Sequence, residues 1–304
     1  MPFTLATYRA EMTPRAGIIS GDAVYDAASL TGREAYTTMQ GILSDWQAAE
    51  TLIRDAMRAP RAPFWPLAQT HLLAPLLAPG AIYCAGANYS DHAAEMARRM
   101  GREPDPDPKA KDAKPWHFLK SPASVTGPGA TIAATHHSRQ LDWEVELAAI
   151  IGRKAKNAGV EDALSYVAGY TAANDLSARD LSRRAGQAPD APFRYDWIGQ
   201  KCFDGACPMG PWIVPASDIP DPQALAMKLW VNDAPMQDSN TAKMIFTLAE
   251  QIAHLSAAIT LNPGDVILTG TPAGVGAGRG VFLKAGDTVR IEIERIGTLS
   301  NIIA

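Results

Sequence analysis

The stretch that decides the fold is residues 142–152, which reads Asp142-Trp143-Glu144-Val145-Glu146-Leu147-Ala148-Ala149-Ile150-Ile151-Gly152. Side chains alternate between the two faces of a strand, so we expect Asp142, Glu144 and Glu146 to point the same way. The run 147–151 has no polar face and predicts a strand buried on both sides. Carboxylates at the mouth of such a strand are costly to desolvate unless a positive charge neutralises them. A divalent cation can do so, since hard oxygen ligands suit Mg²⁺, Mn²⁺ or Ca²⁺. The alternative is a solvated edge strand whose charges face water.

Composition limits the classes of partner. The 304 residues are 47% hydrophobic, enough for a substantial core, and the net charge is −4. The chain has neither the clustered positive charge of a nucleic-acid surface nor an apolar run of about 18 residues, so we expect no nucleic-acid or membrane partner. The three cysteines, at 84, 202 and 207, form no C-x-x-C pair, which argues against a zinc knuckle or disulfide framework. Together with an N-terminus unlike a signal peptide, they predict a cytoplasmic protein with reduced thiols.

Two regions of the chain differ in pattern. Residues 1–77 predict a small N-terminal α/β module, with strands at 4–8, 17–20 and 23–26, a helix at 36–57 and a proline-rich linker. Residues 78–304 predict a domain in which strands dominate, at 81–85, 143–151, 225–231, 265–269 and 288–293. The helices expected there are few, at 91–100, 160–164, 177–184 and 241–258. The pattern as a whole predicts an α+β fold that is mainly β.

A polar, proline-rich excursion at 96–116 interrupts the second region and cannot pack as a core. Long polar loops in compact domains are usually lids or disordered. We interpret residues from about 90 to 117 as a lid, with a solvated excursion as the alternative.

Three segments outside the opening stretch carry candidate chemistry. Asp175 ends a predicted strand at Asn174-Asp175 and is either a third metal ligand or a helix cap. His92 and Glu95 are three residues apart and share one helix face. Such a carboxylate raises the basicity of the imidazole, which can then act as a general base; the alternative is an exposed helical charge pair. Lys201 lies in a turn-rich stretch, where it either binds an oxyanion or is a surface charge.

Taken together, these segments resemble the fumarylacetoacetate hydrolase superfamily over roughly 81–301. The resemblance is carried by ordered blocks: Gly86-Ala87-Asn88-Tyr89-Ser90-Asp91-His92, Phe118-Leu119-Lys120-Ser121-Pro122, Leu141-Asp142-Trp143-Glu144-Val145-Glu146-Leu147, Asn174-Asp175-Leu176-Ser177-Ala178-Arg179-Asp180, Lys201-Cys202-Phe203-Asp204, Gln237-Asp238-Ser239-Asn240-Thr241 and Leu268-Thr269-Gly270-Thr271-Pro272.

The resemblance implies a β-barrel-type core, usually in a homodimer, and Mg²⁺ or Mn²⁺, with Ca²⁺ as a possible substitute, held by Glu144, Glu146 and Asp175. It implies a catalytic role for His92, Glu95 and Lys201. The residues that match substrate-binding positions are Tyr89, Lys120, Arg179, Gln237 and Thr271. One departure is Ser182, where related sequences often carry Gln, and it bears on the identity of the substrate.

The function implied is hydrolysis of a C–C bond in a 2,4-dioxo acid of the acylpyruvate or fumarylpyruvate type. A divalent metal would stabilise the enolate leaving group, and His92 with Glu95 would activate the attacking water. The same metal site also suits a 2-oxo acid decarboxylase, hydratase or isomerase. A non-catalytic binding protein is a third class, against which the intact set of acidic and basic residues argues.

Overall fold

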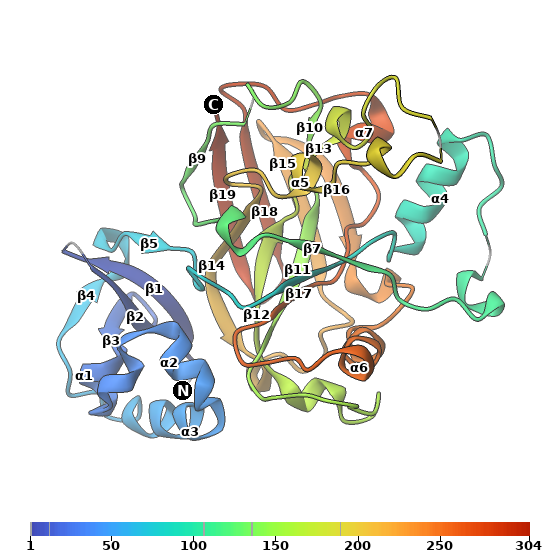
Figure 1. Cartoon of the computed structure of the whole chain (residues 1–304). Helices are drawn as coiled ribbons and strands as arrows, with labels where there is room; N and C mark the ends of the chain where they lie inside the picture. Colours follow the sequence, from blue (N-terminus) through green and yellow to red (C-terminus); the bar gives the residue numbers. More distant parts are fainter. Residues whose placement is uncertain (1, 12, 106, 135, 189) are drawn as a thin grey trace.

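The computed structural model describes the chain except residues 1, 12, 106, 135 and 189, and it is mainly β (Figure 1). The largest sheet has 12 strands in the order β4-β3-β2-β1-β14-β12-β11-β17-β6-β7, with β5 beside β1 and β8 beside β14. Its strands are β1 (Thr4–Ala10), β2 (Thr13–Ser20), β3 (Ala23–Asp26), β4 (Phe64–Pro66), β5 (Leu72–Leu73), β6 (Ile82–Ala85), β7 (His117–Lys120), β8 (Val125–Thr126), β11 (Val145–Ile151), β12 (Val167–Asn174), β14 (Cys207–Pro215) and β17 (Val266–Leu268).

A second sheet of five strands and a two-stranded ribbon complete the β structure. The five strands follow the order β16-β15-β18-β19-β9, and the ribbon pairs β10 with β13. The bounds are β9 (Thr131–Ile132), β10 (Leu141–Asp142), β13 (Ser177–Ala178), β15 (Ala226–Val231), β16 (Ala234–Asn240), β18 (Thr288–Ile293) and β19 (Gly297–Ile303). Among the described strands, the path of the largest sheet is open, from β4 to β7, so the expected barrel-type core is not confirmed.

The α-helices are short. They are α1 (Ala27–Thr31), α2 (Met39–Ser44), α3 (Trp46–Ala56), α4 (Ser90–Arg99), α5 (Trp197–Lys201), α6 (Leu248–Ala258) and α7 (Gly276–Arg279). Of these, α2 and α3 pack against the largest sheet. Figure 1 shows α4 projecting on the side of the molecule away from the N-terminal helices. The helix expected at 36–57 is divided between α2 and α3, and the one expected at 241–258 becomes α-helical only at Leu248.

Strand β11 separates two cores, as its sequence predicts. Leu147, Ala149 and Ile151 join the core shared with β15, β18 and β19. Ala148 and Ile150 join the core that includes α2 and α3 of the N-terminal region. All five side chains are fully buried, which confirms a strand without a polar face.

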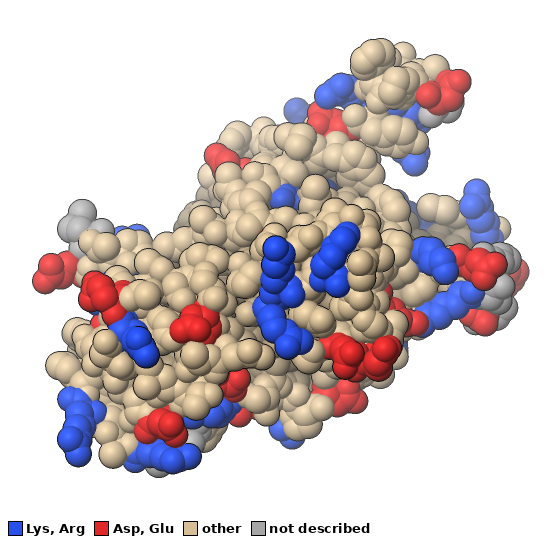
Figure 2. All heavy atoms as spheres, turned by 60° about the horizontal axis from the view of Figure 1, so that its bottom comes forward, with Lys and Arg blue, Asp and Glu red and all other residues tan. Residues whose placement is uncertain are grey.

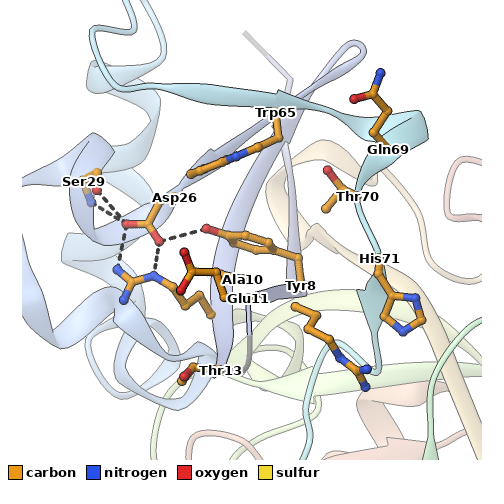
Figure 3. Close-up of a pocket in the computed structure, with 12 residues that line it drawn as sticks. Tyr8, Ala10, Glu11, Thr13, Asp26, Ser29, Trp65, Gln69, Thr70 and His71 are labelled. Atoms are coloured by element: carbon orange, nitrogen blue, oxygen red, sulfur yellow. Dashed lines mark hydrogen bonds and ion pairs between the residues drawn. The ribbon is translucent and has the colours of Figure 1, made fainter.

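The N-terminal region continues the largest sheet, because β1 pairs with β14 through Leu5 and Ile213. Strands from both sides of residue 77 therefore share one sheet, and the division of the chain at that point stays a prediction. This region also holds a cavity of about 660 Å³ beside Tyr8, Asp26 and Trp65 (Figure 3).

The helix expected at 177–184 is wrong. The chain instead forms β13 and a 3₁₀ turn, η6 (Arg179–Leu181). The physical reason is a local pairing: the β13 backbone at Ser177 lies opposite Asp142 of β10, and the side chain of Arg179 reaches Asp142. Tertiary contacts here override local helix propensity.

Among the described residues, no helix is both long and apolar enough to cross a membrane. On the face shown in Figure 2, Lys and Arg are interspersed with Asp and Glu rather than gathered in one basic patch.

Candidate active site

Three carboxylates from neighbouring strands meet in the interior. Glu144, Glu146 and Asp175 are buried, and one oxygen from each lies within 4.8 Å of the others. The antiparallel register explains this, since Val145 pairs with Asn174 and the Asp175 N–H donates to the Glu144 carbonyl at 2.9 Å. The solvated alternative for the opening stretch is therefore wrong.

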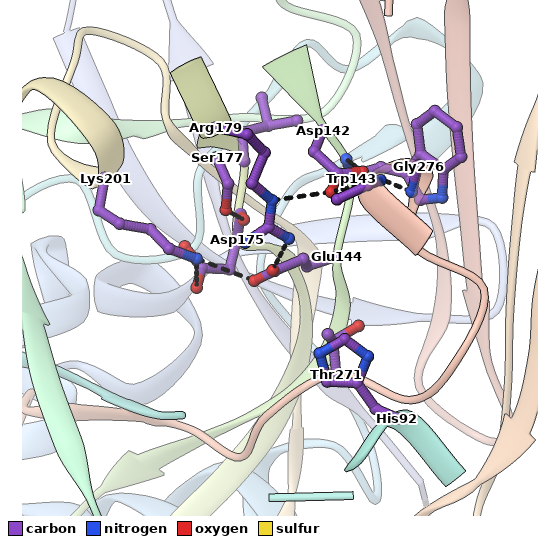
Figure 4. Close-up of polar contacts among 12 residues, drawn as sticks. His92, Asp142, Trp143, Glu144, Asp175, Ser177, Arg179, Lys201, Thr271 and Gly276 are labelled. Carbon is purple, nitrogen blue, oxygen red and sulfur yellow. Dashed lines mark hydrogen bonds and ion pairs between the residues drawn. The ribbon is translucent and has the colours of Figure 1, made fainter. Parts of the chain in front are cut away.

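Two of these carboxylates are neutralised by protein cations (Figure 4). Glu144 pairs with Arg179 and, at 2.9 Å, with Lys201. Asp175 pairs with Lys201 and Lys120, each at 2.6 Å, which also argues against its role as a helix cap. Burial works against charge on Glu144, but Lys201 and Arg179 outweigh it and lower its pKa. Burial likewise lowers the pKa of Lys201, but Asp175 and Glu144 outweigh it and raise that pKa.

Glu146 differs from its two neighbours. Its Oε2 accepts a hydrogen bond from the Gly270 N–H at 2.7 Å, and among the described residues no cation lies within ion-pair distance. Burial, followed by the charges of Asp175 and Glu144, raises its pKa well above the usual range. A divalent cation would supply the missing positive charge, and three carboxylates are a donor set that hard cations accept. The residues present therefore fit a metal ion.

Asp142 does not join the three. Its carboxylate accepts hydrogen bonds from the Gly276 N–H at 2.6 Å and the Ala277 N–H at 3.0 Å, and pairs with Arg179 at 2.8 Å. Burial raises its pKa, and Arg179 opposes that shift. Asp142 thus holds Arg179, which in turn contacts Glu144.

The proposed lid helix α4 carries the His92–Glu95 pair into the site. His92 Nδ1 lies 3.5 Å from Glu95 Oε2, and the two side chains are only 14% and 21% exposed, so the exposed-pair alternative is wrong. The separation exceeds a normal hydrogen bond, and catalytic pairs are often this loose without substrate. Burial raises the pKa of Glu95, but His92 and the Gly274 N–H outweigh it, and the pKa is lowered.

A cavity of about 170 Å³ joins these groups. Seven of the eleven residues predicted to form the site line it: His92, Glu144, Glu146, Asp175, Arg179, Lys201 and Thr271. Sequence reasoning missed the aromatic wall of Trp116, Phe118 and Trp197, whose ring centroids lie 5.6–5.7 Å apart. Isolated aromatics in a polar segment give no periodic signal that would identify them.

A second cavity of about 370 Å³ adjoins the first, because His92 and Arg179 line both. Arg99 and Arg183 also line it, and among the described residues neither has a carboxylate within ion-pair distance. Ser182, the departure noted in the sequence, faces this cavity.

Three described residues expected to bind substrate do not line the 170 Å³ cavity. Tyr89 is fully buried in the core, and its hydroxyl donates to Met227 Sδ at 3.2 Å. Lys120 is buried against Asp175 and the Leu176 carbonyl. Gln237 accepts from the Val145 N–H at 2.9 Å and donates to Thr271 Oγ1 at 2.9 Å, so it supports the loop that carries Thr271. Among the described residues that line the 170 Å³ cavity, none of the three appears. Glu95 does not line that cavity either, but it lies beside His92, which does.

Known proteins similar to this chain come from the family that its sequence resembles. The family model described as fumarylacetoacetate (FAA) hydrolase C-terminal matches residues 81–304. The chain is 40% identical over 266 residues to the mitochondrial oxaloacetate tautomerase Fahd2a of Rattus norvegicus, covering 87% of this chain and 79% of that protein. It is also similar to the maleylpyruvate hydrolase of Sphingobium sp. SYK-6 in complex with manganese(II) and pyruvate, with a TM-score of 0.75, 31% identity and coverage of 99% and 98%. The fumarylacetoacetate hydrolase of Exiguobacterium antarcticum gives a TM-score of 0.79 at 30% identity, with 99% of each chain covered.

Proposed function

Because this chain belongs to the fumarylacetoacetate hydrolase family, we propose that it is a divalent-metal-dependent enzyme that interconverts the keto and enol forms of a 2-oxo diacid of the oxaloacetate type. The observation that carries the proposal is Glu146, a buried carboxylate without a cationic partner among the described residues, in a cavity that His92 also lines. The relatives named as oxaloacetate tautomerases support the reaction type.

Glu144, Glu146 and Asp175 would hold the cation. When bound, Mg²⁺ or Mn²⁺ supplies a Lewis acid that stabilises negative charge on the keto oxygen, and Ca²⁺ is a possible substitute. The manganese in the related maleylpyruvate hydrolase supports this choice of ion. With a divalent cation bound, we expect the four carboxylates of Asp142, Glu144, Glu146 and Asp175 all to be ionised, beside the three cations Lys120, Arg179 and Lys201. The cluster with the metal would then carry one positive charge in excess, which favours an anionic substrate.

The protein's own groups account for the proton transfers. His92 takes a proton from the carbon next to the keto group and returns one to the keto oxygen, so the isomerisation consumes no proton. Glu95, facing Nδ1, stabilises the imidazolium formed in between. Lys201 and Arg179 keep Glu144 ionised and fixed in place.

The neighbouring cavity supports a diacid. The guanidinium groups of Arg99 and Arg183 lie beyond His92 and Arg179 and have no carboxylate partner among the described residues. A guanidinium binds a carboxylate through two parallel hydrogen bonds, so this end of the site suits the second carboxylate of the substrate.

The test is a tautomerisation assay. Enol oxaloacetate is mixed with protein loaded with Mg²⁺ or Mn²⁺, and the loss of enol absorbance is followed above the uncatalysed rate. We expect turnover that chelation abolishes and metal restores, and a fall of about a hundredfold or more in His92→Ala. Full activity in metal-stripped protein, or in His92→Ala, would contradict the proposal.

A second candidate is the C–C hydrolysis predicted from the sequence, favoured by the similarity to the maleylpyruvate hydrolase structure. Here His92 deprotonates a water, the hydroxide adds to the distal carbonyl, the C–C bond breaks, and the enolate is protonated to give a 2-oxo acid. Product analysis after incubation with an acylpyruvate separates this reaction from tautomerisation, and analysis with oxaloacetate reports decarboxylation. Metal binding without turnover of either substrate would favour the non-catalytic binding protein.

Assembly and location are proposals too. The family resemblance implies a homodimer, which sedimentation analysis can test. The sequence favours a cytoplasmic location, whereas the vertebrate relatives are named as mitochondrial, and cell fractionation decides between the two.

A further inference from the structure

One short loop, residues 271–277, binds carboxylates from two different parts of the site through its backbone N–H groups. Ala273 N–H donates to Asp91 at 3.2 Å, and Gly274 N–H donates to Glu95 at 3.1 Å, both on α4. Gly276 and Ala277 donate to Asp142, the residue that holds Arg179. The loop therefore joins the lid helix to the carboxylate centre.

The loop conformation requires glycine at two positions. Gly274 has φ +102°, and a Cβ there would lie 2.2 Å from the Met236 carbonyl oxygen. A Cβ on Gly276 would lie 2.1 Å from the Val281 carbonyl oxygen. The backbone of the loop is thus packed too closely for side chains, which leaves its N–H groups free to face the acids.

The Asp91 side chain contacts several segments outside α4. Its Oδ1 accepts from the N–H groups of Ala273 and His92. Its Oδ2 accepts from Ser239 Oγ at 2.7 Å and pairs with Lys243 Nζ at 3.1 Å. Burial raises its pKa, but Ser239, Lys243 and Ala273 outweigh it, so the pKa is lowered and the carboxylate is ionised. These partners come from β16, from the 3₁₀ turn η9 (Thr241–Lys243) and from the loop, so one side chain ties α4 to three segments.

We propose that Asp91 is a positioning residue, whose carboxylate docks α4 on the 271–277 loop and thereby holds His92 against the carboxylate centre. Asp91 immediately precedes His92, and among the described residues lining the 170 Å³ cavity it does not appear, so it acts through His92. The catalytic part of this inference rests on the proposed function, because it assigns the proton transfer to His92. The docking part rests only on the contacts of Asp91.

The first test is kinetic, on the metal-loaded full chain with enol oxaloacetate. Asp91→Ala removes hydrogen bonds to a charged acceptor, and we expect kcat to fall about ten- to a hundredfold, with Mn²⁺ affinity changed less than about threefold. Asp91→Asn keeps an acceptor for Ala273 and a polar group for Ser239, so it should recover part of the loss. Ser239→Ala and Lys243→Gln should each lower kcat less, and non-additively with Asp91→Ala.

The control variant is Lys109→Gln. Lys109 Nζ pairs with Glu250 at 2.7 Å, at an exposed position elsewhere in the lid segment, so its loss should leave kcat within about twofold. If Lys109→Gln and Asp91→Ala lower kcat equally, Asp91 is one of many lid contacts and the inference is wrong.

The second test needs no activity. Amide hydrogen exchange should be at least about tenfold faster across α4 in Asp91→Ala than in wild type, and unchanged in β11. If the wild-type chain has no tautomerase activity, the proposed function is wrong. Faster exchange across α4 in Asp91→Ala would still support the docking role in that case. Unchanged exchange in α4, or unchanged kcat in an active enzyme, would overturn the role of Asp91. Loss of Mn²⁺ affinity in step with kcat would show a purely structural effect and overturn it as well.

Discussion

Asp26 in the N-terminal region and Glu146 in the candidate active site are both buried carboxylates, yet among the described residues only Asp26 has a cationic partner. Arg15 donates to both oxygens of Asp26 at 2.6 and 3.0 Å, and Tyr8 and Ser29 add further hydrogen bonds. Burial raises the pKa of Asp26, but Arg15 and Ser29 outweigh it, and the pKa falls to about 2. Burial and two neighbouring carboxylates shift the pKa of Glu146 the other way.

The difference separates a structural cluster from the cluster that we propose to be functional. The Asp26 cluster is satisfied within the protein, although the cavity beside it measures about 660 Å³ against about 170 Å³ at the candidate active site (Figure 3). Cavity size is therefore a poor guide here. The better guide is a buried carboxylate without a cationic partner among the described residues, because it must either stay protonated, as its raised pKa indicates, or be neutralised by an external ion.

The largest effect is expected from Glu146→Gln, at the metal site. The amide removes a ligand, so we expect Mn²⁺ affinity and turnover to fall by at least about a hundredfold. In wild type, Mn²⁺ at a hundred times its Kd should stabilise the fold by about 2.7 kcal/mol, and the same concentration should stabilise the variant by no more than about 0.4 kcal/mol. Without metal, the variant should be no less stable than wild type, because a costly buried carboxylate is gone. Calorimetry with and without Mn²⁺ checks both points, and a metal-free variant far less stable than wild type would show that Glu146 is structural.

Asp26→Asn should lower the stability of the fold and leave the metal site unchanged. It leaves the Arg15 guanidinium without its carboxylate, at an expected cost of about 1–3 kcal/mol in unfolding free energy. Mn²⁺ affinity and turnover should stay at the wild-type level. Denaturant titration and the tautomerisation assay measure these quantities, and a lowered Mn²⁺ affinity would mean that the two clusters are coupled.

Acid titration should distinguish a third, partly buried group, His117. Burial lowers its pKa from 6.5 to about 4. The folded protein therefore favours the neutral imidazole of His117. The stability that this preference contributes is complete above pH 6.5 and is lost as the pH falls toward 4. Asp26 loses its own contribution in a lower window, from pH 3.8 toward 2. His117→Phe keeps a ring but cannot titrate, and it should remove about 1–2 kcal/mol of the loss between pH 6.5 and 4. The test is to measure the unfolding free energy of wild type and His117→Phe between pH 6.5 and 4. If its slope against pH is the same in both proteins, other groups cause the loss.

The smallest change in unfolding free energy should come from removing an exposed ion pair. It provides the reference against which the changes at the buried clusters are compared. Lys228 and Asp238 lie 3.3 Å apart with 44% and 67% of their side chains exposed. Lys228→Gln should change the unfolding free energy by less than about 0.5 kcal/mol, because water screens the pair. A larger change, measured by denaturant titration, would show that burial is not what distinguishes Asp26.

Several parts of the structure could be predicted because they depend on local pattern. The uninterrupted apolar run at 147–151 is buried on both faces, and the segment at 288–293 is a strand with the expected bounds. Glu144, Glu146 and Asp175 gather as the carboxylates of a site because acids placed at strand ends meet wherever those strands pair. The spacing of His92 and Glu95 likewise placed both on one face of α4.

Other assignments failed where long-range contacts decide. Ser177 and Arg179 form a strand and a 3₁₀ turn, not a helix, because β10 pairs there. Tyr89, Lys120 and Gln237 are each buried against protein partners, which the sequence did not indicate, and their contact with substrate stays a prediction. Side-chain chemistry names a residue's possible partners but not which of them lies within reach.

The order of residues by itself determined which strands are buried, that acids stand at their ends, and that an imidazole and a carboxylate share a helix face. These follow from strand and helix periodicity, which act over a few residues. Only the tertiary structure decided that Lys120 and Lys201 neutralise Asp175, and that Asp91 and Asp142 bind the same loop. It also decided that Glu146 has one N–H donor and no cationic partner among the described residues. Such pairings join residues far apart in the chain, and electrostatics in a buried site depends on distances that the sequence does not contain.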